Sequence, residues 1–159
     1  MSRISEAKSK EAFCMMYQVI AKACTSCLQT GIKYPDGDEA VGTIKIASFL
    51  QSSMYLLLQR AASDKTVKFT ENDWKLVEPL LENVFPEFVT CLYELYPQLS
   101  IIELRICWLT KLSFSPAEIA RILLRSKQAI SMARSRLYKK FYKKEGSGEK
   151  FDEFVKNLS

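Results

Sequence analysis

Three serines stand at positions typical of helix starts within residues 99–144, and they constrain the fold more than any other feature of the chain. Ser100 and Ser115 are each followed three residues later by a glutamate, which is the spacing of a capping box. Pro116 takes the first helical position, where a helix tolerates proline best, and Ser126 precedes a further apolar pattern of helical period. The pattern predicts three helices joined by very short turns in about 45 residues, an arrangement typical of a helix-turn-helix unit.

Apolar residues also recur at three- and four-residue steps in earlier parts of the chain, between residues 13 and 28 and between residues 47 and 61. We interpret the first stripe as one helix and the second as another, which ends near Ser63. Both stripes are typical of a core or of a dimer surface. No stretch alternates polar and apolar residues with a period of two, so the sequence predicts an all-α fold.

A further helical stripe is expected between these regions, over residues 74–88. Thr70 is followed three residues later by Asp73, which predicts a capped start. Pro79 and Pro86 lie within the stripe, and each removes a backbone hydrogen-bond donor. We therefore expect a kinked or broken helix pair that ends near Tyr96.

These patterns divide the chain into three parts. Residues 1–98 form a helical region for dimerisation or sensing, with a loop predicted at 31–42 from its glycines and proline. Residues 99–144 form the helix-turn-helix domain. Residues 145–159 begin with a Gly-Ser-Gly link and continue as a short helix that packs back or completes a dimer surface.

Charge is distributed unevenly along the chain. Residues 1–98 contain 10 basic and 12 acidic side chains, whereas residues 99–144 contain 11 basic and 2 acidic side chains. A basic segment of this density favours a polyanionic partner, here double-stranded DNA, over the alternative of a merely solvated surface. The outward face of the last of the three helices carries Gln128, Ser131 and Ser135, which are short enough to approach base edges in a major groove.

Histidine is absent, which excludes a Ser-His-Asp triad and histidine-ligated metal sites. The cysteines number five, and the pair Cys24 and Cys27 has no second ligand pair for zinc, so we assign it to core packing. This cysteine usage predicts a reducing, cytoplasmic location. No apolar run is long enough to span a membrane. We expect no cofactor, no metal and no catalytic activity.

Several of these residues carry a family resemblance. The series Leu99, Ser100, Glu103, Phe114, Ser115, Glu118, Ile119, Ala120, Leu123, Ser126, Ala129, Ile130, Leu137 and Lys140 resembles the LuxR/GerE-type helix-turn-helix, and it is similar to that of sigma factors. Closer still is the C-terminal part of a group of Bacteroidetes transcriptional regulators. That group has an Asp-Trp helix, a Tyr-Pro-x-Leu junction and an R-x-R-L-x-K-K run. Here these begin at Asp73, Tyr96 and Arg134.

The resemblance implies where DNA contacts fall. Its recognition helix reads bases with the residues that stand here at Ser131, Met132 and Ser135, although family members often carry lysine at the first and last of these. Lys127 and Gln128, at the start of the helix, are further base-reading candidates. The expected phosphate-binding residues are Ser115, Arg125, Arg134, Arg136, Lys139 and Lys140.

The sequence thus predicts a bacterial transcriptional regulator that binds specific sites on duplex DNA as a homodimer, with RNA polymerase as a further candidate partner. An alternative is a protein-interaction module whose basic face docks an acidic partner, such as polymerase or a regulator of a sigma factor. Tyr138 and Tyr142 would support that role. A thiol or carboxylate enzyme is a third alternative, without a base or phosphate loop to favour it.

Overall fold

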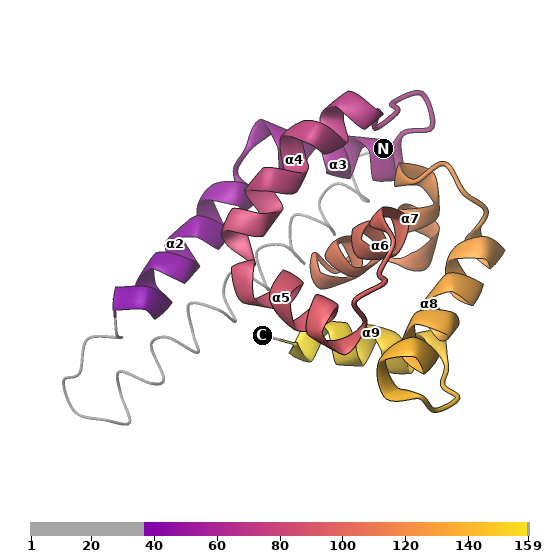
Figure 1. Cartoon of the computed structure of the whole chain (residues 1–159). Helices are drawn as coiled ribbons and strands as arrows, with labels where there is room; N and C mark the ends of the chain where they lie inside the picture. The colour runs from indigo at the N-terminus through magenta and orange to yellow at the C-terminus, as the bar shows by residue number, and fades with distance from the viewer. Residues whose placement is uncertain (1–36, 159) are drawn as a thin grey trace. The chain divides into compact units, whose positions relative to one another are not determined.

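The structure is a computed structural model, and it describes residues 37–158. Within those residues it contains eight helices and no strand, so the predicted all-α class is confirmed for this part of the chain (Figure 1). The chain divides into two compact units, one ending at Leu56 and the other beginning at Leu57.

Helix α2 extends over Gly37–Leu50. The loop predicted at residues 31–42 is therefore wrong for its second half, while residues 31–36, like the stripe at residues 13–28, lie outside the described residues. The stretch Gly37–Leu50 contains no proline, and the glycine in the interior of the helix, Gly42, costs only about 1 kcal/mol relative to alanine. The other turn-forming residues precede the helix instead of lying within it.

Helix α3 extends over Ser53–Ser63, so the single helix expected before Ser63 is in fact two. The break lies at Ser52. Its hydroxyl donates to the Phe49 carbonyl at 2.6 Å and accepts from the Tyr55 backbone N–H at 3.2 Å. Serine competes in this way with the backbone hydrogen bonds of a continuous helix. The apolar spacing stays in phase across the break, which is why periodicity alone missed it.

Helices α4 (Glu71–Val84) and α5 (Pro86–Leu95) confirm the expected broken pair. Thr70 and Asp73 form the capping box, Pro79 lies inside α4, and Pro86 occupies the first turn of α5. The inward face of α4 is apolar, and it includes the fully packed Trp74. The buried residues of the pair are Trp74, Val77, Leu81, Val84, Phe88 and Leu92.

Three helices follow over the segment that the sequence singles out: α6 (Ile101–Lys111), α7 (Pro116–Ile122) and α8 (Lys127–Tyr142). Each begins at its predicted serine. The side chains of Ser100, Ser115 and Ser126 each accept a hydrogen bond from the backbone N–H three residues later. In the first two cases the glutamate side chain completes the capping box. The predicted helix starts are confirmed.

The two connections between these helices have the same construction. Ser113 and Leu124 adopt the left-handed conformation, with φ of 66° and 54°, and each lies two residues before the next capping serine. In the second turn the Arg125 N–H donates to the Ala120 carbonyl at 2.8 Å, and the corresponding bond in the first turn measures 3.0 Å. These bonds close α6 and α7 as Schellman motifs, which ordinarily use glycine at the left-handed position.

Helix α9 (Gly148–Asn157) packs against α8 and α6, as Figure 1 shows at the yellow end of the chain. Phe151 and Val155 are completely buried. Ring centroids of Phe141 in α8 and Phe151 in α9 lie 6.4 Å apart. Of the two roles suggested for the C-terminal helix, packing back onto the chain is the one observed.

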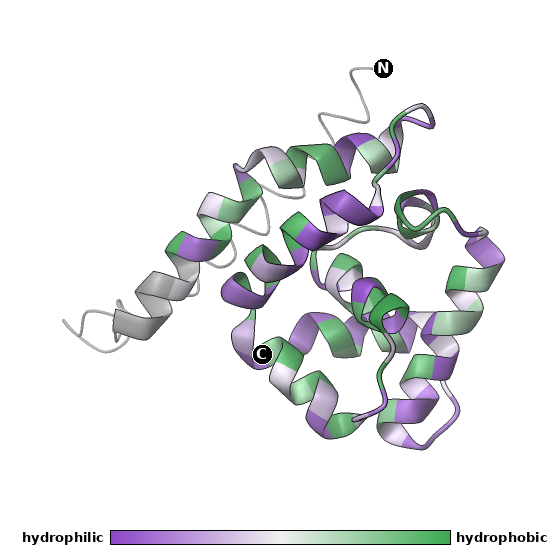
Figure 2. Cartoon of the chain, turned by 45° about the horizontal axis from the view of Figure 1, so that its top comes forward, coloured by the Kyte–Doolittle hydropathy of each residue, from purple (hydrophilic) through white to green (hydrophobic). Residues whose placement is uncertain are grey.

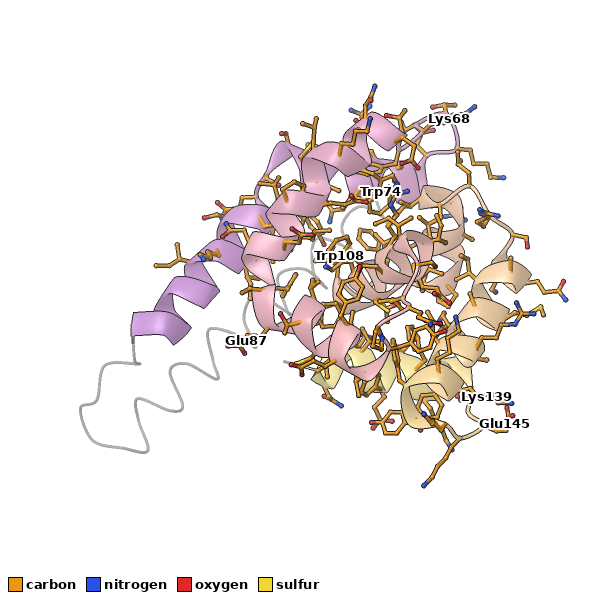
Figure 3. All side chains as sticks on the ribbon, viewed as in Figure 1. Lys68, Trp74, Glu87, Trp108, Lys139 and Glu145 are labelled. Atoms are coloured by element: carbon orange, nitrogen blue, oxygen red, sulfur yellow. The ribbon has the colours of Figure 1, made fainter. Side chains whose placement is uncertain are left out.

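Arg105 joins α4 to α6. Its guanidinium makes a bidentate pair with Glu71 at 2.7 and 2.9 Å, bonds to Glu78 at 2.8 Å, and lies 4.6 Å from the ring centroid of Trp74, which is labelled in Figure 3. Burial by itself would lower the pKa of Arg105, but the two carboxylates outweigh it and raise that pKa. The hydrogen bonds from Arg105 lower the pKa of Glu71. Helix α4 is thereby fixed to α6 within the second unit.

Candidate nucleic-acid interface

Helix α8 has one face in the interior and one in solvent. Ile130, Leu137 and Phe141 are buried, and the buried face also includes Arg134. Figure 2 shows that hydrophilic and hydrophobic residues alternate around this helix. The mean hydropathy of the whole chain is −0.07, so polar and apolar residues are also balanced overall. The inward positions recur at three- and four-residue steps, so the residues between them face outward.

The outward face of α8 contains four residues that we call the outward stripe: Gln128, Met132, Arg136 and Lys139. All four are exposed, and they follow one another at steps of three or four residues, so their side chains lie along one line of the helix. The first two are uncharged and the last two are cationic. The stripe therefore has an uncharged half near the helix start and a basic half near its end.

Ser131 and Ser135 lie on the flank of this stripe and are half-buried. Lys127 is exposed at the helix start. The five predicted base-reading residues are thus divided: Gln128 and Met132 lie on the stripe, while the two serines lie beside it. Met132 is 47% exposed, and other large apolar side chains of the described residues, such as Leu76 and Leu124, are exposed as well.

Arg134 is turned inward, away from the other basic residues of the helix, and is only 5% exposed. Its Nε donates to Asp152 Oδ1 and its Nη2 to the Gly148 carbonyl, both at 2.9 Å, and Nη2 also pairs with Asp152 Oδ2. A Cβ added at Gly148 would lie 3.1 Å from the Arg134 Cζ atom. This guanidinium is therefore committed to α9, which revises the phosphate role that the sequence suggests for it.

Lys140 is also engaged within the protein. Its Nζ pairs with Glu103 in α6 and lies 4.8 Å from the ring centroid of Tyr96. Partial burial favours a raised pKa for Glu103, but hydrogen bonds from Lys140 and Ser100 outweigh it, and the pKa lies below its usual value. Lys140 thus joins α8 to α6, and we remove it from the set of phosphate candidates as well.

Two predicted phosphate-binding residues, Arg125 and Arg136, remain available, together with Lys127, which the sequence predicts to read bases. Arg125, Lys127 and Arg136 are exposed, and no ion pair joins any of them to another residue of the described part of the chain. Lys139 pairs with Glu145, and the two are labelled together at the end of α8 in Figure 3. Their side chains are 60% and 82% exposed, and such surface pairs contribute about 0–1 kcal/mol, so Lys139 is easily recruited by a stronger anion.

Two further features of the interface differ from the sequence-based set. Ser115 is exposed, but its hydroxyl accepts from the Glu118 N–H, so it serves first as a helix cap. Lys143 and Lys144, directly beyond α8, are exposed cations that sequence reasoning had left out of the phosphate set. Helical spacing extended by one turn past Lys139 reaches Lys143, and the same step past Lys140 reaches Lys144.

A surface hollow of about 540 Å³ lies on another flank of α8, beside α9. Tyr138 and Tyr142 stack with ring centroids 4.9 Å apart, and Tyr142 meets Phe154 edge-on at 5.0 Å. Lys150 and Glu153 also line the hollow. The two tyrosines that support the protein-docking alternative therefore lie together at one place.

The described residues favour neither metal binding nor thiol chemistry. No group of three or more cysteine and acidic side chains among them is arranged to hold a metal ion. Burial raises the pKa of the Cys107 thiol, and the nearby Glu103 charge raises it further, so the reactive thiolate is disfavoured. Cys24 and Cys27 lie outside the described residues.

Within the part of the chain that the structure describes, no helix is both long enough and apolar enough to cross a membrane. No protein-family model, curated protein or solved structure matches the chain. The chemistry of the residues on and around α8 therefore carries the functional argument.

Proposed function

We propose that the chain is a transcriptional regulator that binds duplex DNA, with α6, α7 and α8 acting as a helix-turn-helix and α8 entering the major groove. It catalyses no reaction in this proposal. The observation that carries it is the outward stripe: an exposed line on α8 that is uncharged at the helix start and basic at the helix end. A protein–DNA contact needs both kinds of side chain, because base edges give specificity while phosphates give affinity and position.

The division of the basic residues supports the same proposal. Arg134 and Lys140 are used to hold α8 against α9 and α6, whereas Arg125, Lys127 and Arg136 are held by no ion pair in the described residues. Internal pairing keeps the helix in place, and the unpaired cations are left for an external anion. A merely solvated surface has no need of cations collected around the start and the outer face of one helix.

The direct test is a selection from a pool of random 20-base-pair duplexes with the purified full chain at moderate salt. The expected result is an enriched sequence motif. A substitution on the stripe, Gln128→Ala, is expected to alter that motif, since each lost base contact costs roughly 1–3 kcal/mol of discrimination. Leu76→Ala is a matched control, because Leu76 is 62% exposed on α4 and lies on a different helix. Retention of DNA without any enrichment would contradict sequence-specific binding.

Dimerisation is part of this proposal, because a dimer that binds two DNA half-sites has a higher affinity than a single copy that binds one half-site. A motif with two-fold symmetry is then expected from the selection. The spacing of its halves would report the distance between the two copies of α8.

The second candidate function is docking of an acidic partner protein, such as polymerase. The hollow lined by Tyr138, Tyr142 and Phe154 favours it, since aromatic residues are enriched where proteins meet, and Lys150 at the same place offers a positive charge to an acidic partner. Tyr142→Ala separates the two functions. It is expected to leave the selected DNA motif unchanged and to weaken only the capture of purified polymerase.

A further inference from the structure

We propose that the outward stripe reads A·T base pairs: Gln128 binds the major-groove edge of adenine, and Met132 packs on the methyl group of thymine. The inference rests on the proposed function, and it specifies the chemical class of DNA site that the interface recognises. It follows from the kinds of side chain on the uncharged half of the stripe.

Gln128 lies in the first turn of α8 and is exposed. No side-chain hydrogen bond joins it to other residues of the described part of the chain, so its amide is available. A glutamine amide offers one acceptor and one donor side by side. Adenine presents the complementary pair, an N6–H donor and the N7 acceptor, whereas guanine presents two acceptors there. Opposite guanine the glutamine carbonyl would face O6 or N7 without a proton between them.

Met132 follows one helical turn later on the same line, and it is 47% exposed. Ala129, between these two turns, is exposed as well, so the middle of the uncharged half presents an apolar surface. Thymine is the base that offers an apolar group in the major groove, its C5 methyl. An apolar side chain buries surface against that methyl, whereas against cytosine it would desolvate the N4 amino group without a partner.

The spacing suits neighbouring bases of one site. Four residues of α-helix rise about 6 Å, and successive base pairs of B-DNA lie about 3.4 Å apart, so Gln128 and Met132 reach pairs one or two steps from each other. Arginine and lysine are the usual readers of guanine, and the first cation on the stripe is Arg136, a further turn along. Within the stripe, the cations that could read guanine thus lie in its basic half, while Lys127, at the helix start, lies off the line of the stripe.

The test uses the full chain and the duplex enriched from the random 20-base-pair pool. Each thymine of the motif is replaced singly by uracil, which removes only the methyl group. Each adenine is replaced singly by 7-deazaadenine, which removes only the N7 acceptor. We expect one uracil position to weaken binding about fourfold, as the loss of one buried methyl predicts. We expect one deaza position to weaken it about fivefold or more.

Variants assign each effect to its residue. Met132→Ala is expected to abolish the sensitivity to uracil, while Met132→Leu, which keeps an apolar side chain at the same place, retains it. Gln128→Ala is expected to abolish the sensitivity to 7-deazaadenine. Leu76→Ala on α4 is the control and is expected to retain both effects.

The outcomes separate the inference from the function on which it rests. A motif of G·C pairs alone, or a motif whose thymines and adenines tolerate both replacements in the wild-type chain, overturns the A·T assignment and leaves DNA binding intact. Sensitivity to uracil that persists in Met132→Ala overturns the role of Met132. The absence of any enriched motif overturns the proposed function and this inference together.

Discussion

Two arginines separated by one residue on α8 have opposite surroundings. Arg134 is 5% exposed and bound to Asp152, while Arg136 is exposed on the outward stripe. Residues two positions apart on an α-helix point to opposite sides, so the same residue type meets the interior in one case and solvent in the other. This contrast makes the pair a test of which cations meet DNA.

We predict that Arg136→Gln lowers the salt dependence of DNA binding, whereas Arg134→Gln leaves it unchanged. Each phosphate contact contributes about 0.9 to the slope of log K against log salt concentration. Arg134→Gln should instead lower the free energy of unfolding by roughly 1–3 kcal/mol, because it breaks charged hydrogen bonds to α9. The measurements are fluorescence anisotropy on a 20-base-pair duplex at several salt concentrations, and urea unfolding.

Lys68→Gln serves as the control, since Lys68 is an exposed lysine of the link before α4 and should change neither quantity. Equal slopes for the wild type and Arg136→Gln, in a protein that remains folded, would remove Arg136 from the interface. A reduced slope for Arg134→Gln would restore the phosphate role that the sequence suggests.

A second prediction concerns the turn between α7 and α8. Leu124 has a φ of 54° and a side chain that is 64% exposed. A left-handed conformation costs a residue other than glycine about 1–2 kcal/mol, so Leu124→Gly should stabilise the protein by about 0.5–1 kcal/mol after the entropy of glycine is counted. Leu123, its neighbour, has a φ of −85°, and Leu123→Gly should destabilise it. Thermal unfolding of the two variants checks the opposite signs.

At the scale of the elements, close approach between α8 and the link to α9 depends on glycine. A Cβ at Gly146 would lie 2.1 Å from Cδ1 of the Tyr138 ring. We predict that Gly146→Ala displaces this ring and costs about 1–3 kcal/mol. Gly42 in α2 has nothing within 4 Å of such a Cβ, so Gly42→Ala should stabilise by about 0.4–1 kcal/mol. Urea unfolding gives both values, and equal signs would contradict the prediction.

The contact between α6 and α8 makes stability depend on pH. Lys140 and Ser100 hold the pKa of Glu103 below its usual 4.5 in the folded chain. A lowered folded pKa gives stability that is present above pH 4.5 and is lost as the pH falls through the folded value. We predict that Glu103→Gln flattens the acid limb of this dependence. The measurement is the urea midpoint between pH 7 and pH 3, and an acid limb as steep as that of the wild type would contradict the prediction.

The elements that the sequence predicted best are those determined by contacts close in the chain. Ser100, Ser115 and Ser126 cap their helices through partners three residues away, so spacing alone was sufficient. The break at Ser52 was missed because the apolar period continues through it. Turns without glycine, as at Leu124, give no signal of their left-handed residue.

The candidate site was likewise predictable only where contacts close in the chain determine its side-chain positions. Exposure of Gln128 and Arg136 follows from helical spacing, and both were expected. The inward position of the Arg134 side chain depends on its hydrogen bond to Asp152, which lies 18 residues further along the chain and on another helix. Pairing between residues this far apart leaves no periodic pattern in the sequence. The sequence alone therefore predicts that Arg134 binds a DNA phosphate.

For the whole molecule, the boundary between the two compact units falls inside α3, between Leu56 and Leu57. Every helix that borders the candidate interface belongs to the second unit, and its contacts with α4 through Arg105 and with α9 through Arg134 lie inside that unit. The second unit thus contains a complete set of internal contacts for holding α8. A fragment that begins at Ser53 keeps α3 whole.

We predict that the fragment 53–159 folds cooperatively and binds a 20-base-pair duplex, and that each bound copy of the fragment contributes the same salt slope as each copy in the full-length dimer, because all the candidate phosphate-binding residues lie within it. Since the proposed dimerisation is assigned to residues 1–98, removal of residues 1–52 should reduce the selected motif from two half-sites to one and lower the affinity. Urea unfolding followed by circular dichroism measures the folding, fluorescence anisotropy at several salt concentrations measures the slope and the affinity, and pool selection gives the number of half-sites. A fragment that still selects a two-fold motif would place the dimer contact within residues 53–159, because the truncated chain would then carry all that pairing requires.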